Sequence, residues 1–197
     1  MIMTDDEGKS YDLIASKFAD IRNSFQTEQK YIDLFTSYLR PRAHILDVGC
    51  GSGTPVSSYL IYQDYKVTGL DSSEKLLKFA KKNCPTMEII YGDMRTVEIK
   101  QQFDGIIEWW ALFHVPKKDH ALMISRFASW LKKGGFLEFT TGDTDCHLRT
   151  SEMLKQELNF YSLHPDAYEK ALKENGLKLI LKEYDQAEHL VWLAMKE

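Results

Sequence analysis

The sequence predicts an α/β fold: a doubly wound, mostly parallel seven-stranded sheet with helices on both faces, an antiparallel last strand and an N-terminal helical cap. Short apolar runs alternate with segments of helical periodicity, which is typical of strands joined by crossover helices. An apolar run at 44–49 breaks into a glycine-rich turn, as expected where a strand leads into a helix beside a ligand. Only residues 185–188 join the last two strands, and this connection is too short for a crossover, so the pair should be antiparallel.

The N-terminal part of the chain is expected to be helical. Residues 1–9 are acidic and polar and predict a loose segment. Residues 11–39 carry apolar side chains at helical spacing, which predicts two helices that end before Pro41. We therefore expect residues 1–40 to form a helical cap that precedes the sheet.

Strand and helix patterns alternate along the rest of the chain. The predicted elements are strand 44–49, helix 54–63, strand 66–70, helix 73–82, strand 87–91, strand 103–108, helix 117–132 and strand 136–141. A helix at 165–175 opens with Pro165, which suits a first turn, and strands 177–184 and 189–195 follow it. The segment 142–164 lacks clear periodicity in its first half and follows a strand, so we expect it to fold over a pocket as a lid.

Length, composition and charge fit one domain over 1–197 and leave the oligomeric state open. A chain of 197 residues with 44% hydrophobic content can bury a full core. The net charge of −4 argues against a nucleic-acid substrate, because phosphate binding requires a concentrated basic surface. The chain has no charged-then-apolar leader and no run of about 18 apolar residues, so we expect neither secretion nor membrane spanning. The three cysteines are odd in number and show no metal-ligand spacing, which favours a cytoplasmic location.

The turn after the first predicted strand carries the strongest functional signal. Three glycines stand there at alternate positions, and they are Gly49, Gly51 and Gly53. Glycine allows positive φ and a close approach of the backbone to a ligand, because it has no Cβ. A helix that begins after the turn points its free N–H groups and its positive dipole end back at it. The spacing differs from the G-x-G-x-x-G fingerprint of nicotinamide-dependent oxidoreductases, and it predicts a nucleotide-like ligand.

Three predicted strands carry an acid at or just beyond their carboxyl ends, namely Asp47, Asp71 and Asp93. In a parallel sheet these ends meet at one edge, so the three carboxylates should converge beside the glycine turn. An acid in the position of Asp71 can accept hydrogen bonds from both hydroxyls of a ribose. Asp71 and Asp93 could instead be helix N-caps, which explains each acid alone but not their shared placement.

At these residues the chain resembles the class I, Rossmann-like S-adenosylmethionine-dependent methyltransferases of small-molecule type. The resemblance covers about residues 11–141 and rests on five blocks in the family's order. The blocks are Leu46–Gly53, Gly69–Asp71, Gly92–Met94, Phe103–Ile107 and Leu131–Gly135. The resemblance implies an S-adenosyl-L-methionine site at the carboxyl edge of the sheet.

The resemblance also implies a role for each cofactor-binding residue. The three glycines and Cys50 would line the methionine and ribose portions, and Asp71 with Ser72 would hold the ribose. Asp93 would accept from the adenine amino group, with Met94 beside the ring. Asp47 would orient the turn or the ammonium group, Trp109 would border the methionine end, and Tyr11 would close over the methionine carboxylate.

Methyl transfer from a sulfonium mainly requires alignment of donor and acceptor and, where needed, removal of a proton. Trp109, Trp110 and Phe113 are expected to wall the methyl-transfer site and to contact the sulfonium by cation–π attraction, although each tryptophan could equally be a core residue. His114 is the candidate base, with a pKa that can lie near neutrality, and its alternative role is to anchor the turn. In the expected lid, Arg149 is either a contact for a substrate carboxylate or a surface residue.

Several functions are set aside by what the chain lacks. No Asn/Asp-Pro-Pro-Tyr/Phe segment follows strand 103–108, and no Pro-Cys pair is present. Amino-methyltransferases of nucleic acids and glutamine, and methyltransferases of cytosine C5, are therefore not favoured. Asp143, Asp145 and His147 stand at alternate positions, but no further residue completes a metal site. We expect methyl transfer to a small-molecule acceptor through oxygen, nitrogen, sulfur or carbon. The alternative is a cofactor-binding module that is catalytically idle and acts through a protein partner.

Overall fold

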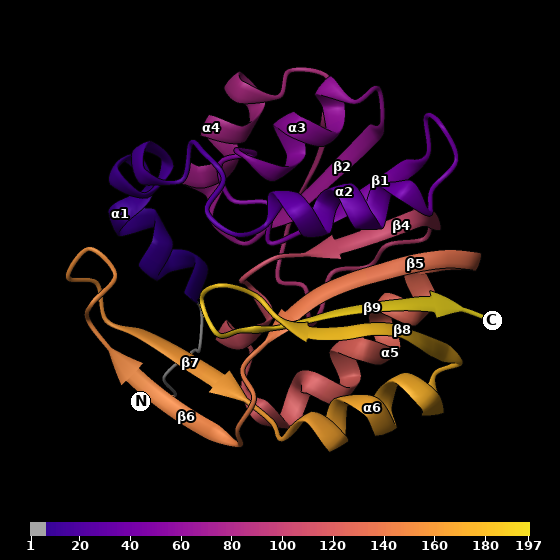
Figure 1. The fold of residues 1–197 in the computed structure, drawn as a ribbon. Coiled ribbons are helices and arrows are strands. Elements are labelled where there is room, and N and C mark those ends of the chain that lie inside the picture. Colours follow the sequence, from indigo (N-terminus) through magenta and orange to yellow (C-terminus); the bar gives the residue numbers. More distant parts are fainter. Residues whose placement is uncertain (1–6) are drawn as a thin grey trace.

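The computed structural model describes residues 7–197 (Figure 1). Its helices are α1 (Glu7–Ile21), α2 (Gln29–Ser37), α3 (Val56–Tyr62), α4 (Glu74–Asn83), the short 3-10 helices η1 (Leu112–His114) and η2 (Lys117–Asp119), α5 (His120–Trp130) and α6 (Pro165–Glu174). Its strands are β1 (His44–Val48), β2 (Lys66–Asp71), β3 (Glu88–Tyr91), β4 (Phe103–Glu108), β5 (Leu131–Thr141), β6 (Cys146–Thr150), β7 (Leu158–Ser162), β8 (Leu177–Tyr184) and β9 (Leu190–Lys196).

The predicted fold class is confirmed. The large sheet has seven strands in the order β3-β2-β1-β4-β5-β9-β8. The first five of these strands pair in parallel, and β9 pairs antiparallel with both β5 and β8. This is a Rossmann-like sheet of the doubly wound kind, with the antiparallel last strand that the short connection at 185–188 predicted.

Helices cover both faces of the sheet because the strands alternate their apolar side chains between two cores. On β1, Leu46 packs into a core with α5 and α6, whereas Ile45 packs into a core with α2, α3 and α4. On β4, Ile106 and Ile107 divide between the same two cores. Figure 1 shows α2, α3 and α4 on one side of the sheet and α5 and α6 on the other.

The strand order reverses between β1 and β4, and this reversal places the site. From β1 the chain proceeds outward to β2 and β3, and it then returns to β4 on the other side of β1. Ligands of such sheets bind beyond the carboxyl ends of the strands at this point. The glycine turn leaves β1 there, and the segment with Trp109 and Trp110 leaves β4.

Two predicted boundaries are wrong, and one segment contains strands that were not predicted. Helix α1 begins at Glu7, so residues 7–9 are not loose, while residues 1–6 lie outside the described part of the chain. Strand β5 begins at Leu131 rather than at 136, because the chain passes directly from α5 into the pairing with β4. The segment 142–164 contains a hairpin, β6–β7, whose register pairs Cys146 with Ser162.

The hairpin escaped prediction because all five residues of β6 are at least partly exposed, so no alternation of polar and apolar side chains marks it. Within residues 7–197, no helix has both the length and the apolar character that crossing a membrane requires.

Candidate functional site

A cavity lies at the carboxyl edge of the sheet, between the glycine turn, α1, the segment after β4 and the β6–β7 hairpin. All but one of the predicted site residues line it. These are Tyr11, Asp47, Gly49, Cys50, Gly51, Asp71, Ser72, Asp93, Met94, Trp109 and His114. They come from α1, β1, β2, η1 and the loops that follow the strands, so the fold brings together residues more than 100 positions apart.

The backbone of the glycine turn is held in place by the neighbouring strand. The N–H groups of Gly49 and Cys50 donate to the carbonyl of Leu70, at 2.7 and 3.1 Å. Gly49 has φ +77°, and a Cβ there would lie 2.2 Å from the Cβ of Ala111. Gly49 is therefore required both by the backbone conformation and by the segment that crosses above it.

Gly53 is the predicted residue that does not line the cavity. Its φ is +77°, and a Cβ would lie 3.0 Å from the Sγ of Cys84 and 3.4 Å from the Cα of Ala80. Both neighbours belong to α4 or its C-terminal cap. The third glycine thus lets the turn pack against α4, and it lies away from the space that a ligand would occupy.

Asp71 ties the glycine turn to the start of α4. Its Oδ2 accepts from the N–H of Gly51 at 2.8 Å, and its Oδ1 accepts from the N–H of Ser73 at 2.7 Å. Burial raises the pKa of Asp71, and the backbone donors oppose that rise. The N-cap of α4 is Ser73, whose hydroxyl accepts from the N–H of Leu76. A carboxylate can accept about four hydrogen bonds, so Asp71 retains capacity for ribose hydroxyls.

Asp47 lies beneath the turn and is almost fully buried. The hydroxyl of Ser57, on α3, donates to its Oδ2. Burial raises the pKa of Asp47 to about 7, and the nearby carboxylate of Asp71 adds to the rise. A cationic group bound beside Asp47 would supply the charge partner that this carboxylate lacks.

Asp93 is held by Arg95. The backbone N–H of Arg95 donates to Oδ1 at 2.8 Å, and its Nη2 donates to Oδ2 at 2.6 Å. Burial opposes ionisation, but the side chain and backbone of Arg95 outweigh it and lower the pKa of Asp93. No helix begins here in the structure, so the N-cap alternative does not describe Asp93.

The turn after β4 is organised by a buried carboxyl group. Oε1 of Glu108 accepts from the N–H groups of Ala111 and Leu112, each at 2.6 Å, and its Oε2 accepts from the N–H of Thr140 at 3.1 Å. Burial raises the pKa of Glu108 to about 7. The N–H of Trp110, which has φ +60°, donates to the Oγ1 of Thr140 at 2.8 Å.

The two tryptophans differ in environment. Trp109 is 6% exposed and packs against Tyr31 at 5.7 Å between ring centroids, so it is both a core residue and part of the cavity wall. Trp110 is only partly buried and lines the cavity, with the guanidinium of Arg22 over its ring. Trp109 thus combines the two alternative roles, core residue and cavity wall, whereas Trp110 belongs to the cavity wall.

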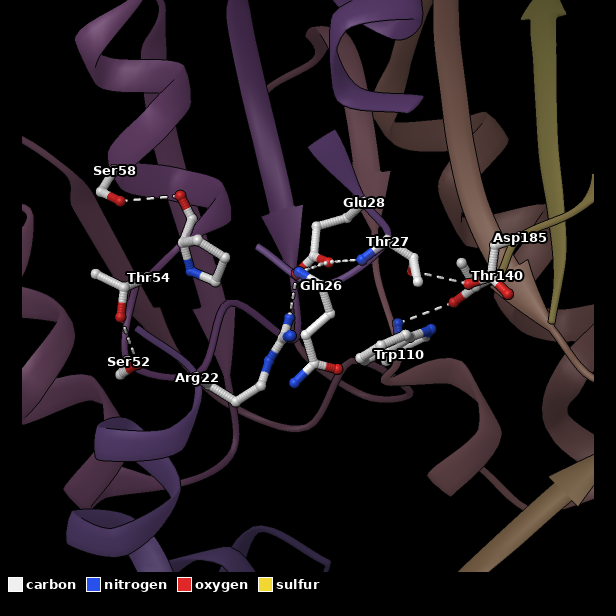
Figure 2. A network of polar contacts seen from close by, with 11 residues as sticks. Arg22, Gln26, Thr27, Glu28, Ser52, Thr54, Ser58, Trp110, Thr140 and Asp185 are labelled. Carbon is white, nitrogen blue, oxygen red and sulfur yellow. Dashed lines mark hydrogen bonds and ion pairs between the residues drawn. The ribbon is translucent and has the colours of Figure 1, made fainter. Parts of the chain in front are cut away.

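Arg22 is a site residue that sequence reasoning missed. Its Nη2 donates to the Oε1 of buried Glu28 at 2.6 Å, and its guanidinium lies 4.9 Å from the centroid of the Trp110 ring. Its Nη1 is buried and has no hydrogen-bond partner. Figure 2 shows Arg22 directed at Glu28, with Gln26 and Trp110 beside it. The residues next to Arg22 in the sequence give no sign of this role, because the fold brings Trp110 to it.

His114 lines the cavity and makes two hydrogen bonds. Its Nδ1 lies 2.8 Å from the carbonyl oxygen of Asn159, and its Nε2 lies 2.9 Å from the hydroxyl of Tyr11. Burial lowers the pKa of His114 to about 4, although the Asn159 carbonyl opposes this. The expectation of a pKa near neutrality is therefore wrong, because aromatic side chains surround the ring. The bond to Asn159 also anchors the turn, as the alternative role required.

The hairpin contributes Met153 and Phe160 to the cavity wall. Arg149 does not line the cavity; it forms an exposed ion pair with Glu157 at 2.6 Å, which fits the surface alternative. In the part of the chain that the structure describes, no three His, Cys, Asp or Glu side chains are grouped so as to hold a metal ion.

Comparisons with known proteins find similar sequences over part of this chain. Residues 45–135 match a family described as a methyltransferase domain. An uncharacterized methyltransferase of Bacillus thuringiensis (strain Al Hakam) is 28% identical over 127 residues, covering 62% of this chain and 59% of that protein. A ubiquinone biosynthesis O-methyltransferase of Coxiella burnetii (strain RSA 493 / Nine Mile phase I) is 39% identical over 103 residues, covering 50% and 43%. The chain thus matches about half the length of these relatives.

Solved structures show the same fold over nearly the whole chain. Magnesium protoporphyrin IX methyltransferase from Synechocystis PCC 6803, with bound SAM, aligns with a TM-score of 0.75 at 18% identity and covers 100% of both chains. A TehB-like SAM-dependent methyltransferase from Corynebacterium glutamicum aligns with a TM-score of 0.71 at 20% identity, covering 97% of this chain and 98% of that one. Residues 45–135 are thus similar to a methyltransferase domain, and the whole chain has the fold of these S-adenosylmethionine-dependent methyltransferases.

Proposed function

We propose that this protein binds S-adenosyl-L-methionine and transfers its methyl group to a small-molecule acceptor. The proposal rests mainly on one observation: the glycine turn, Asp47 and Asp71 all line the same cavity. The N–H of Gly51 donates to Asp71, so the glycine turn and the carboxylate expected to bind the ribose hold each other in position.

The chemistry of the lining gives the ligand an orientation. The adenosine portion would lie at the ends of β2 and β3, with the ribose at Asp71 and the adenine between Asp93 and Met94. The methionine portion would then follow the turn past Gly49 toward Trp109. A carboxylate that accepts two backbone N–H groups, as Asp71 does, is already oriented before a ligand arrives, which reduces the cost of binding.

Two charged residues suit the two charges of an amino-acid group. Asp47 is a buried carboxyl with a raised pKa, and an ammonium group near it would favour its ionised form. Arg22 has one terminal nitrogen bonded to Glu28 and one, Nη1, without a partner, which a carboxylate would satisfy. We assign Arg22 to the methionine carboxylate, in the place that the sequence suggested for Tyr11.

A small acceptor is supported by the walls of the cavity and by the charge of the chain. The hairpin and α1 close over the site, so a large substrate would have to displace them. The net charge of −4 disfavours nucleic acid, and the buried thiols of Cys50 and Cys84 suit a reducing, cytoplasmic environment. Solved structures with the same fold include methyltransferases of magnesium protoporphyrin IX and of 1,6-didemethyltoxoflavin, both small molecules.

In this proposal the residues of the chain align and shield the reacting groups. Bound S-adenosylmethionine supplies an electrophilic methyl group on a sulfonium, which an acceptor attacks in line. Trp109 and Trp110 exclude water on one side and present aromatic rings to a cation. Ala111 and the turn that Glu108 holds fix the distance between the donor site and the acceptor site.

The test is transfer of a labelled methyl group from S-adenosylmethionine to a panel of small metabolites. Label in an organic product, at a rate proportional to enzyme concentration, supports the proposal. If the folded protein binds the donor but methylates nothing in a broad panel, the idle module that acts through a protein partner replaces the enzyme. If it does not bind the donor, the proposal fails at its first step.

A further inference from the structure

The part of the cavity beyond the predicted donor site is walled by aromatic rings. Phe113 and Phe160 lie 5.2 Å apart between centroids, and His114 lies 4.7 Å from Phe113 and 4.9 Å from Phe160. Met153 adds a flexible thioether from the hairpin. Centroid separations of this size are those of favourable ring pairs, and methionine adapts its shape to a neighbouring ring. We call Tyr11, Phe113, His114, Met153 and Phe160 the aromatic chamber.

The aromatic chamber carries no charged side chain. Of the described residues that line the neighbouring part of the cavity, Arg22 is charged, and it is already ion-paired with Glu28. The carboxylates of the cavity stand at the other end, on β1, β2 and after β3. Because an unpaired charge is costly to bury, the chamber favours an uncharged, flat acceptor.

The hydrogen bonds of His114 fix where its proton is. The carbonyl oxygen of Asn159 can only accept, so Nδ1 at 2.8 Å carries the hydrogen. In a neutral ring Nε2 is then the acceptor, and the hydroxyl of Tyr11 at 2.9 Å must donate to it. The low pKa of His114 agrees with a neutral ring at physiological pH. The proton of Tyr11 therefore points at His114.

This direction makes Tyr11 a proton acceptor on its cavity side. A hydroxyl oxygen that donates its hydrogen can still accept up to two hydrogen bonds. A hydroxyl on a ligand in the aromatic chamber can donate to the Oη of Tyr11, which completes a chain of three hydrogen bonds that ends at the Asn159 carbonyl.

We propose, building on the function proposed above, that the acceptor is a flat hydroxylated aromatic compound, and that Tyr11 and His114 together remove the proton of its hydroxyl. As the new O–CH₃ bond forms and the S–CH₃ bond breaks, the hydroxyl proton passes to the Oη of Tyr11. The proton of Tyr11 passes to Nε2 of His114. The products are an aryl methyl ether, S-adenosylhomocysteine and a protonated His114, which returns its proton to solvent. The positive charge of the sulfonium thus ends on the imidazole.

A hydroxyl acceptor fits the uncharged chamber and the hydrogen-bond chain of Tyr11 and His114 better than an amine does. An alkylamine is mostly protonated at neutral pH and would need a carboxylate in the chamber, which the described lining does not provide. A hydroxyl arrives neutral and becomes a strong acid as it is methylated, so it requires a proton acceptor within hydrogen-bond reach.

The first test separates this proposal from the function on which it rests. Donor binding is measured calorimetrically, and labelled-methyl transfer is then compared among catechol, aniline and cyclohexanol, with the products identified by mass spectrometry. We expect an aryl ether from catechol and little product from the others. Donor binding with transfer only to aniline or cyclohexanol would overturn the acceptor class. Absence of donor binding would overturn the underlying function instead.

The second test uses Tyr11→Phe, which keeps the ring that packs against Phe18 at 5.0 Å. Tyr184→Phe is the matched control, because Tyr184 is exposed and bonds to Asp143 away from the cavity. We expect kcat for Tyr11→Phe to fall about 100-fold or more, within the range for loss of acid–base catalysis, while the Kd of the donor stays within about threefold.

A rescue experiment distinguishes proton transfer from simple packing. 4-Nitrophenol is mostly ionised in mildly alkaline solution and needs no base there, so Tyr11→Phe and His114→Gln should methylate it under those conditions nearly as fast as the unaltered enzyme does. An equal loss on catechol and on 4-nitrophenol would show that the pair only shapes the chamber, and it would overturn the proposed proton path.

Discussion

Replacing Gly49 by alanine tests whether the glycine turn and the segment after β4 form one rigid cradle. Gly49 has φ +77°, and a left-handed conformation costs an alanine about 1–2 kcal/mol. The new Cβ would also lie 2.2 Å from the Cβ of Ala111, whereas carbon atoms in contact lie about 3.5–4.0 Å apart. Forcing an extra methyl group into a packed site costs about 1–3 kcal/mol more. The free energy of unfolding should therefore fall by about 2–5 kcal/mol.

Two matched variants separate the conformational cost from the clash. Gly134→Ala places the same residue at φ +75° with no atom within 4 Å of the added Cβ, so it should cost only about 1–2 kcal/mol. The pair Gly49→Ala with Ala111→Gly removes the clash and should return most of the difference, relative to Ala111→Gly alone. Urea denaturation provides all four free energies. If Gly49→Ala is no more destabilising than Gly134→Ala, the two segments do not touch as the structure indicates.

Three further predictions concern Asp47, Gly53 and Arg22. Burial raises the pKa of Asp47 from 3.8 to about 7, so the folded chain binds more protons than the unfolded chain between these two pH values. The free energy of unfolding should therefore fall as the pH rises from about 4 to 7. Urea denaturation at several pH values should show a smaller fall for Asp47→Asn, and an unchanged dependence on pH would contradict the shift. Gly53→Ala should destabilise the fold, because its Cβ would press against α4. Donor affinity, measured on the folded fraction at low temperature, should change less in Gly53→Ala than in Gly49→Ala. A larger loss of donor affinity in Gly53→Ala would place Gly53 at the ligand. Arg22→Gln should weaken donor binding about tenfold or more, with exposed Arg42→Gln as the control, and equal affinities would remove Arg22 from the site.

The sequence was most informative where a function rests on contiguous residues. The run from Asp47 to Ser52 and the acids Asp71 and Asp93 stand at or just beyond the carboxyl ends of short apolar strands, so the parallel topology alone brings them to one edge. Their convergence on the cavity was therefore predictable. The seven-stranded sheet followed from the same alternation of elements.

Features that depend on contacts between distant segments were not predictable. Tyr11 and His114 are 103 positions apart, and the bond from His114 to Asn159 spans 45, so the tautomer and the low pKa of the imidazole follow only from the fold. Arg22 gained its role through Glu28 and Trp110 in the same way. The packing of Gly53 against α4 also depends on a distant segment, because Ala80 and Cys84 lie about 30 positions away, and the sequence did not indicate it.

Calorimetric titration with S-adenosylmethionine shows whether the turn and Asp71 hold the donor. We predict one donor bound per chain and no binding of NAD. Asp71→Asn should lose about 1–3 kcal/mol of binding free energy, roughly 5- to 150-fold in Kd. The control Asp64→Asn changes an exposed carboxylate paired with Arg42 and should bind as the unaltered chain does. Folded protein that binds no donor, or equal affinities for the unaltered chain and Asp71→Asn, would contradict the account.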